Sequence, residues 1–527
     1  MTMDQTQRTR DLLKQITRSS PDEIERWAKE DGFVALVLDK DAATSKNGQL
    51  TFLTAANLLL RLHPVVTRVV VVVEVDAPLL VDAPLFAGDS MAVALKAFHG
   101  ALSPLVSLEI TSDISRADEC QFAICIGGFF HQRHCISVGS DGWNVSLSTV
   151  APIPLGSTFN PIGSMTAACL AVSEGFKRVL AIKAESLGVP PGTLPSMQFF
   201  VGSYSFSTLT YVALNPQTPN PSLPDVLDVG EISMIGVGAG GGACLYALST
   251  MPLSGTLWTV DPDVVNDPNL NRYLYATEHD ARQLRKKVDV INEVLNHQHA
   301  LQRRLFDLPF LEFKSQHPEW PKNLVLSTVD TAEARHAIQW ETPRLVLDAA
   351  VSQSAVYVHR VELGRSACLK CTHPTSTEQP DIVRSIAGVV GLEVGEVNRL
   401  YFDNVPLSSD VARVVGENAV AHSLPAPTAG MTLKDWVTLH CGQMNLKAEA
   451  DMVLPIPFAT VLPGILLAGE IIKERCFPDH VVKDRVNHDL FGLPSGWLTT
   501  PLRPDPSCDL CGNQTVRAVY DRAYKEG

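Results

Sequence analysis

The chain has 527 residues, of which 45% are hydrophobic and 19% charged, and its formal net charge is -14. This composition excludes a disordered chain, and an acidic balance without a long Lys/Arg run argues against a nucleic-acid-binding protein. The N-terminus, Met1 to Arg18, lacks the apolar core of a secretory signal, and the most apolar stretch, Val65 to Leu85, contains charges and prolines. We therefore expect a cytoplasmic protein that does not span a membrane and has about two large domains.

Strands and helices alternate in the first part of the chain. The expected elements are a strand, a helix and three further strands, at Phe33–Leu38, Leu50–Leu62, Arg68–Val75, Gln121–Ile126 and His134–Val138. This order predicts βαβ units on a parallel sheet. The loop Asp39–Gly48 has no Gly-x-Gly-x-x-Gly. We interpret residues 1–214 as a degenerate, non-binding Rossmann-like domain.

A Pro-rich linker, residues 215–230, precedes a second βαβ series, residues 231–527. Each half contains a small-residue helix in which Pro is followed by Glu thirteen positions on and by Lys three later, in Pro161–Lys177 and Pro457–Lys473. Chance similarity between generic helices is one explanation. We favour diverged copies of one unit that pack as an internal pseudo-dimer, and a further homodimer stays open.

The strand at Glu231–Ile235 is followed by a glycine-rich turn. Gly236, Gly238 and Gly241 fit Gly-x-Gly-x-x-Gly, which allows a tight turn and brings phosphate oxygens to a helix N-terminus. The next strand ends at Asp261, where an acidic residue can bind ribose hydroxyls. These features predict a nucleotide site, and a nicotinamide-dependent dehydrogenase would share them.

The residues that follow separate these possibilities. Asn269-Leu270-Asn271-Arg272, then Lys286-Lys287, and then Asp330 with Arg335 five positions on, supply the groups that clamp a triphosphate and hold Mg²⁺. Taken singly, Arg335 and Lys286 are better explained as solvated surface side chains.

This ordered set resembles the adenylation domain of the ThiF/MoeB and ubiquitin-activating enzyme superfamily, over Glu231 to about Lys473. The resemblance implies two ThiF-type domains, the first degenerate and the second active with ATP. It also implies that Asp261 binds ribose, and that Asn269, Arg272 and Lys287 hold phosphates. Asp330 would organise Mg²⁺. Lys287 is chosen over Lys286 because the family lysine usually precedes a small apolar residue, and Tyr273 departs from the usual Gln.

Two Cys-x-x-Cys pairs, Cys368 with Cys371 and Cys508 with Cys511, have the spacing of zinc knuckles. We expect them to share one structural Zn²⁺ site, as pairs at equivalent points do in the family. A redox dithiol is the alternative.

Residues 372–456 form a stretch that the simplest family members largely lack, and it contains Cys441. In the superfamily, the crossover loop before the small-residue helix often carries a thiol that forms a thioester, so Cys441 is the candidate nucleophile. Its thiolate would need a cationic or helix-terminal neighbour, such as His440 or Lys434. A packed core cysteine is the alternative.

Other cysteines and histidines fit structural positions better. Cys244 lies in the helix after the glycine loop, and Cys476 lies near a helix end. A cluster in the first half, formed by Cys125, His131, His134 and Cys135, is better explained by buried thiols beside surface histidines than by a second metal site.

The predicted reaction is adenylation of the C-terminal carboxylate of a small ubiquitin-like protein, with ATP and Mg²⁺, followed by thioester formation and transfer to a conjugating enzyme. The fusion of an inactive half to an active one favours the activating enzyme of a bacterial ubiquitination-like operon. The alternatives are sulfur-carrier adenylation for thiamine or molybdopterin synthesis, and a Rossmann oxidoreductase or scaffold. In the superfamily a catalytic Arg often comes from the N-terminal segment of the partner subunit, here Arg8, Arg10 or Arg133.

Overall fold

The computed structural model of the chain describes residues 9–10, 13, 17, 21–128, 134–189, 194–352, 354–374, 382–402, 405–420, 424–440 and 456–525. The chain divides into two compact units. The larger comprises Met1–Thr372 with Val453–Gly527, and the smaller comprises His373–Met452. Within the larger unit we call residues 1–214 the first half and the remainder the second half.

The first half is built on an eight-stranded sheet in the order β3-β2-β1-β4-β5-β6-β7-β8. Strands β1 to β5 pair in parallel and β5 to β8 pair antiparallel. The five valines of β2 are all buried, as is typical of a parallel sheet covered on both faces. The strands are β1 Phe33–Leu38, β2 Arg68–Val73, β3 Ser107–Thr111, β4 Phe122–Ile126, β5 Cys135–Asp141, β6 Asn144–Ser148, β7 Ser203–Ser207 and β8 Val212–Ala213. The helices are α2 Pro21–Lys29, α3 Lys40–Ala43, α4 Lys46–Leu59, α5 Met91–Leu102, η1 Ile114–Glu119 and α6 Pro161–Ser186.

The second half repeats this topology. Its eight-stranded sheet has the order β11-β10-β9-β12-β13-β14-β15-β16, and the pairing changes from parallel to antiparallel after β13. The strands are β9 Leu227–Ile235, β10 Leu253–Val260, β11 Leu301–Phe306, β12 Val325–Ser327, β13 Val346–Ser352, β14 Ala355–Val361, β15 Arg485–Asp489 and β16 Trp497–Thr500. The helices are α7 Ala239–Ser249, η2 Asp267–Asn269, α8 Glu278–Arg282, α9 Lys287–Val294, α10 Phe310–Gln316, α11 Ala332–Trp340, α12 Leu369–Thr372, α17 Pro457–Cys476, η4 Pro478–His480 and α18 Gln514–Tyr524. The prediction of two Rossmann-like domains in one chain is confirmed.

Two element boundaries differ from those expected from the sequence. Helix α4 begins at Lys46, not at Leu50, because the Ser45 hydroxyl accepts the Gly48 N–H and caps the helix. Strand β9 begins at Leu227, inside the range assigned to the linker, and pairs with β10 from Leu253 onward. A glycine at 230 and a register shift near Ser254 interrupt the pattern on which the sequence boundary depended.

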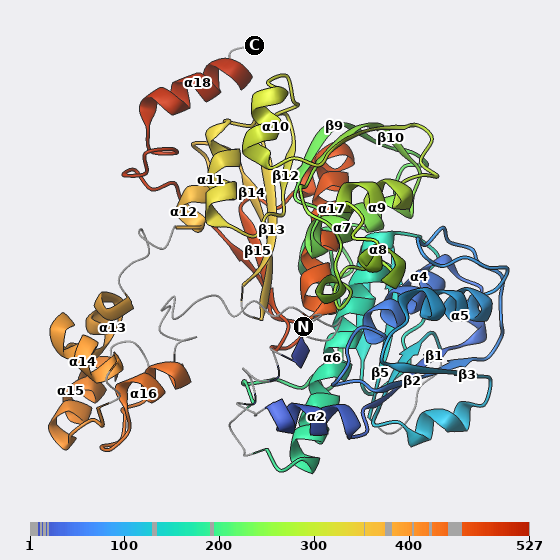
Figure 1. The fold of residues 1–527 in the computed structure, drawn as a ribbon, viewed down its shortest axis with the longest axis horizontal. Coiled ribbons are helices and arrows are strands. Elements are labelled where there is room, and N and C mark those ends of the chain that lie inside the picture. The colour runs from blue at the N-terminus through green and yellow to red at the C-terminus, as the bar shows by residue number, and fades with distance from the viewer. Residues whose placement is uncertain are drawn as a thin grey trace. The chain divides into compact units, whose positions relative to one another are not determined.

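Helices α6 and α17 pack against each other and join the two halves (Figure 1). They are the two predicted related helices, and each connects the sixth and seventh strands of its own sheet. Lys473 and Glu470 form a fully buried ion pair with Nζ and Oε1 2.7 Å apart, and Lys177 pairs with Glu174 in the same way.

Both buried pairs reach across to the opposite half. The Lys177 Nζ donates to the Gly492 carbonyl, 2.9 Å away between β15 and β16, and the Tyr211 hydroxyl before β8 donates to Glu470 at 2.8 Å. The interface is therefore pseudo-symmetric, as in an internal pseudo-dimer.

The smaller unit contains four helices within the described residues, which are α13 Ile382–Val390, α14 Val394–Phe402, α15 Ser409–Ala419 and α16 Leu433–His440. Its core includes Val397, Tyr401, Val415 and Trp436, all of them buried. This core is its own, so the predicted stretch at residues 372–456 contains an independently packed unit.

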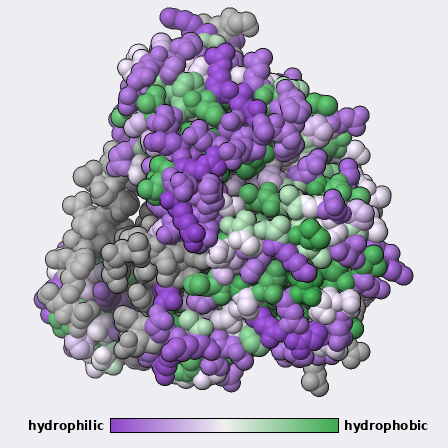
Figure 2. All heavy atoms as spheres, turned by 45° about the vertical axis from the view of Figure 1, so that its right-hand side comes forward, coloured by the Kyte–Doolittle hydropathy of each residue, from purple (hydrophilic) through white to green (hydrophobic). Residues whose placement is uncertain are grey.

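The face shown in Figure 2 is mainly hydrophilic in its upper part, and hydrophobic residues gather at its lower right. In the part of the chain that the structure describes, no helix combines the length and apolar character needed to cross a membrane.

Candidate nucleotide site and cysteine cluster

The glycine-rich turn lies where the strand order of the second sheet reverses. Strand β9 has β10 on one side and β12 on the other, so the loops that leave β9 and β12 diverge at their carboxyl ends. Ligands of open α/β sheets bind at this switch point. Gly236 begins the turn, and Asp330 follows β12 at the same edge.

Two of the motif positions require glycine, one because of its backbone conformation and the other because a side chain would clash with its neighbours. Gly236 has a φ of +92°, and its carbonyl accepts the Thr328 hydroxyl at 2.7 Å. A Cβ on Gly241 would lie 2.3 Å from the Gly236 oxygen and 2.5 Å from Thr328 Oγ1. The tight approach of helix to turn therefore excludes any side chain at 241.

Gly238 is different, because a Cβ there would meet only the Tyr273 hydroxyl, at an ordinary 3.8 Å. Gly238 is also the N-cap of α7, and no side chain caps this helix. An open space in front of an uncapped helix N-terminus suits an anionic phosphate.

Asp261 ties the glycine turn to the next strand. Its carboxylate accepts the Val237 N–H at 2.6 Å and the Asp263 N–H at 2.9 Å. Burial raises the pKa of Asp261, and the nearby Lys287 opposes this shift. A carboxylate can accept about four hydrogen bonds, so the fixed Asp261 keeps capacity for ribose hydroxyls.

The structure distinguishes the two adjacent lysines. Lys287 is buried, and its Nζ lies 2.7 Å from Asp263 Oδ2 and 3.6 Å from Asp261 Oδ1. Burial acts to lower its pKa, but Tyr273, Asp261 and Asp263 outweigh burial, so the pKa is raised and the charge is retained. The side chain of Lys286 is 41% exposed and lies 3.7 Å from Asp307.

Arg272 and Lys287 both lie near the ring of Tyr273, at 5.5 and 5.6 Å from its centroid. The Arg272 guanidinium donates to the Pro268 carbonyl and to Asn271 Oδ1, both at 2.8 Å. Asn269 is used locally, since its Oδ1 accepts the Asn266 N–H at 3.0 Å. Arg272 and Lys287 are thus brought together beside the glycine turn, and Asn269 shapes the loop that carries Arg272.

Considered by itself, Arg335 was expected to be a solvated surface residue, but the structure places it in a buried position. It is buried on α11, and its Nε lies 3.0 Å from Oδ1 of Asp348, which is fully buried on β13. Burial opposes the charge of Arg335, but Asp348 and Tyr357 raise its pKa, and the exposed Asp330 lies close enough to add to this effect. The sequence offered no signal for Asp348 or Thr328, because both positions depend on packing.

The turn of the first half is closed by its own side chain. Asp39 follows β1 where Gly236 follows β9, and its carboxylate accepts the N–H groups of Ala42 and Gly128. The carboxylate occupies these donors, and its negative charge opposes the binding of an anion at this turn. This geometry agrees with the prediction that the first half does not bind nucleotide.

The N-terminal segment of the first half reaches the second half. Thr9 is buried, and its hydroxyl lies 3.4 Å from Asn271 Nδ2. Arg10 forms an ion pair with Glu25 of α2. Arg8 and Arg133 lie outside the described residues.

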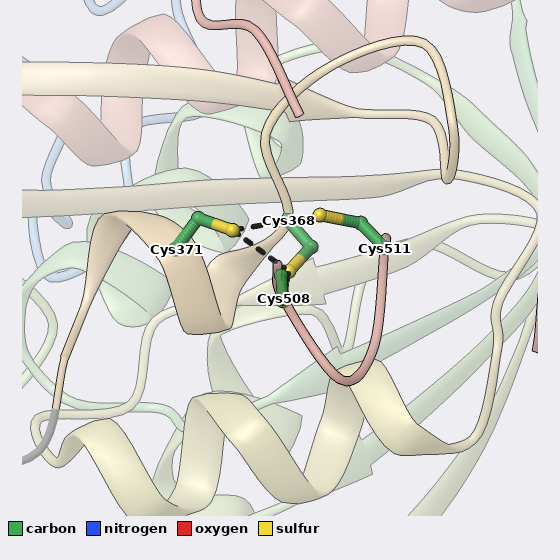
Figure 3. A group of neighbouring side chains, drawn as sticks. All are labelled: Cys368, Cys371, Cys508 and Cys511. Carbon is green, nitrogen blue, oxygen red and sulfur yellow. Dashed lines mark hydrogen bonds between the residues drawn. The ribbon is translucent and has the colours of Figure 1, made fainter. Parts of the chain in front are cut away.

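The two Cys-x-x-Cys pairs, 137 positions apart between Cys371 and Cys508, form one cluster (Figure 3). Their Sγ atoms all lie within 4.8 Å of one another, and Sγ of Cys371 and Cys511 are 3.4 Å apart. Four thiolates about 2.3 Å from a tetrahedral Zn²⁺ stand about 3.8 Å apart. The cluster could therefore hold Zn²⁺ with little rearrangement.

The candidate nucleophile Cys441 lies outside the described residues, which end at 440 and resume at 456. Among the other cysteines, Cys244 is buried in α7, and burial raises its pKa. Cys125 and Cys135 are buried on β4 and β5. Among the described residues, the cysteine cluster is the sole group of three or more potential metal ligands. His131 lies outside the described residues.

Comparison with known proteins decides the family. A model of the ThiF family matches residues 221–495, more than half of the chain. The chain belongs to the ThiF family. This ThiF membership supports an adenylyltransferase activity in general, and it confirms the resemblance drawn from the motifs. A second model, for the BilD N-terminal domain, matches residues 33–188.

One relative of this ThiF-family chain is the uncharacterized protein y4jF of Sinorhizobium fredii, which is 27% identical over 94% of this chain and 92% of its own. Crystal structures of E. coli MccB were also found. MccB with ATP is 12% identical over 54% of this chain and 66% of its own, with a TM-score of 0.34. MccB with MccA-N7isoASN is 13% identical over 54% and 67%, with a TM-score of 0.32.

Proposed function

We propose that this chain activates a small ubiquitin-like protein in the manner of a ubiquitin-activating enzyme, in the cytoplasm of a bacterium with a ubiquitination-like operon. The observation that carries this proposal is the glycine cradle at the switch point, with Asp261, Lys287 and Arg272 beside it. The fused first half and its match to the BilD N-terminal domain favour protein conjugation over the sulfur-carrier alternative.

In the proposed first step, an oxygen of the carrier's C-terminal carboxylate bonds to the α-phosphorus of ATP. The bond from that phosphorus to the bridging oxygen breaks, and pyrophosphate leaves. Arg272 and Lys287 stabilise the negative charge of the leaving group. Asp330 would hold Mg²⁺, which neutralises phosphate charge when bound.

In the proposed second step, the Cys441 thiolate attacks the acyl carbon of the adenylate, and AMP leaves as the thioester forms. A conjugating enzyme then accepts the carrier from Cys441. The proposed Zn²⁺ on the four cysteines takes no part in either step, because a closed Cys₄ site leaves no open coordination position.

Pyrophosphate exchange tests this proposal. We expect the chain to exchange labelled pyrophosphate into ATP only when its cognate carrier is present, and Cys441→Ala to retain exchange but lose a carrier adduct that added thiol cleaves. Exchange with no Cys441-dependent adduct would favour the sulfur-carrier alternative. Turnover of a nicotinamide cofactor without exchange would favour an oxidoreductase.

A further inference from the structure

A buried arginine of the first half lies against the phosphate-binding loop of the second half. Arg61 follows α4 and is 5% exposed. Its guanidinium donates to the backbone carbonyls of Leu270 and Ala276, which are more than 200 positions away, with the second distance 3.1 Å. One planar group thus holds both ends of the segment 270–276.

Asn57, one helical turn before Arg61, completes the contact. It is fully buried, and its Oδ1 accepts the Arg61 Nε–H at 2.7 Å. Its Nδ2 donates to the Leu274 carbonyl at 3.1 Å. Together, Asn57 and Arg61 bind three carbonyls of one loop across the interface between the halves.

The clamped segment is the one that carries Arg272 and Tyr273. Arg272 and Lys287 lie 5.5 and 5.6 Å from the centroid of the Tyr273 ring, so a shift of this segment would move Arg272 relative to Lys287, and these are the charges proposed to meet phosphate. Burial raises the pKa of Tyr246 on α7, the helix that follows the glycine turn, and Arg61 and Asn57 lie close enough to Tyr246 to influence that pKa. The two residues therefore lie near both elements of the proposed phosphate site.

This arrangement is costly if its purpose is stability alone. Within the described part of the chain, the hydrogen-bond partners of Arg61 are neutral, namely the Asn57 amide and two carbonyls. Burial lowers the pKa of Arg61 to about 9. Well-packed apolar residues would usually stabilise such an interface at least as well as a buried charge, so the retained charge indicates a positioning role.

We propose that Asn57 and Arg61 are positioning residues that hold the phosphate-binding segment 269–273 in place from the degenerate half. The first half then serves the ATP site without binding nucleotide itself. This inference rests on the proposed function, because it assumes that Arg272 meets the phosphates of ATP.

Calorimetric titration of the full chain with Mg·ATP and with AMP tests the proposal. In Arg61→Met, we expect the affinity for Mg·ATP to fall by at least about tenfold, since hydrogen bonds from a charged group are lost. The affinity for AMP should change by less than about twofold, because its ribose meets Asp261 on another loop.

Asn57→Asp keeps the test decisive if Arg61→Met fails to fold. The aspartate still accepts the Arg61 Nε–H and adds an ion pair, but it can no longer donate to Leu274. We expect a folded variant with weakened Mg·ATP binding, because the added ion pair with Arg61 offsets part of the lost hydrogen bond. Arg178→Met is the matched control, since Arg178 also donates to a carbonyl, that of Phe200, within the first half.

Mg·ATP affinities like that of wild type in the folded variants would overturn the positioning role. Equal losses of ATP and AMP affinity would also overturn it, since they indicate a general structural defect. Failure of the proposed function gives a different result, in which the wild-type chain itself binds no Mg·ATP.

Discussion

Gly238 and Gly241 belong to one motif, but the space around them differs. A Cβ at 241 would collide with the Gly236 carbonyl, whereas a Cβ at 238 would meet nothing closer than 3.8 Å. We expect Gly241→Ala to lower the free energy of unfolding by about 1–3 kcal/mol. Gly238→Ala should lower stability by less, through the poorer N-cap alone, and weaken ATP binding by filling the phosphate space. Thermal unfolding and ATP titration check both, and equal destabilisation would contradict this account.

His488 on β15 should make stability depend on pH. It is buried, its ring stacks on Trp497 at 4.4 Å, and burial lowers its pKa from 6.5 to about 4. Nearby Asp489 raises this pKa and Lys177 lowers it further. As the pH falls, His488 is protonated near pH 6.5 in the unfolded chain but only near pH 4 in the folded chain. The free energy of unfolding should therefore decrease by up to about 3 kcal/mol as the pH falls from 6.5 to 4.

His488→Phe keeps the aromatic stack without a titrating group. We expect the free energy of unfolding, measured by denaturant titration at several pH values, to vary less over this range in the variant. An identical decline in both proteins would assign the pH dependence to other groups.

Motif residues and the residues that support them differ in how far the sequence predicts them. The positions of Gly236 and Asp261 follow from spacing along the chain, because a strand, a tight turn and a helix fix them locally, whereas the choice of Lys287 depended on the family resemblance. The placement of Arg61 against Leu270 depends on the packing of α4 across the interface. No local pattern encodes such a contact, so only the structure reveals it.

At the scale of elements, the approach of α17 to α7 fixes the glycine-loop helix. A Cβ on Gly464 of α17 would lie 2.1 Å from the Gly240 carbonyl and 2.9 Å from the Ala243 side chain. We expect Gly464→Ala to separate the helices, lower the unfolding temperature and weaken ATP binding. The control is Gly100→Ala on α5, where a Cβ meets nothing within 4 Å. It should be neutral or slightly stabilising. Equal effects of Gly464→Ala and Gly100→Ala on unfolding and ATP binding would contradict this role of the α7–α17 contact.

Alternation of strands and helices predicted the class of both sheets, because buried parallel strands have a continuous apolar pattern. The first and last residues of the helices and strands were less predictable. Strand β9 starts within the proposed linker, and α4 starts before its apolar run. In both places a backbone irregularity or a cap determines the boundary, and hydrophobic periodicity does not detect either.

At the scale of the whole molecule, the cysteine cluster joins distant parts of the second half. Cys368 and Cys511 belong to a buried core that also includes Phe313 and Tyr520. We expect a single zinc ion per chain by elemental analysis, and a lower unfolding temperature after chelation or in Cys508→Ser. Metal-free protein with an unchanged unfolding temperature would support the redox-dithiol alternative instead.

The two halves have one topology but different turns at the same place in the fold. The turn that begins at Gly236 leaves open space at Gly238, whereas Asp39 fills the equivalent turn with a carboxylate. Together with the pseudo-symmetric contacts of α6 and α17, this difference predicts one adenylation site per chain. The sequence indicated the missing glycines, but not the carboxylate that replaces the anion.

Carrier-dependent ATP–pyrophosphate exchange tests the central claim most directly. The account predicts exchange by the wild-type chain with its cognate carrier, and a loss of at least about a hundredfold in Asp330→Ala, as for removal of one group that stabilises a transition state. No exchange with any cognate carrier, or exchange undiminished by Asp330→Ala, would contradict it.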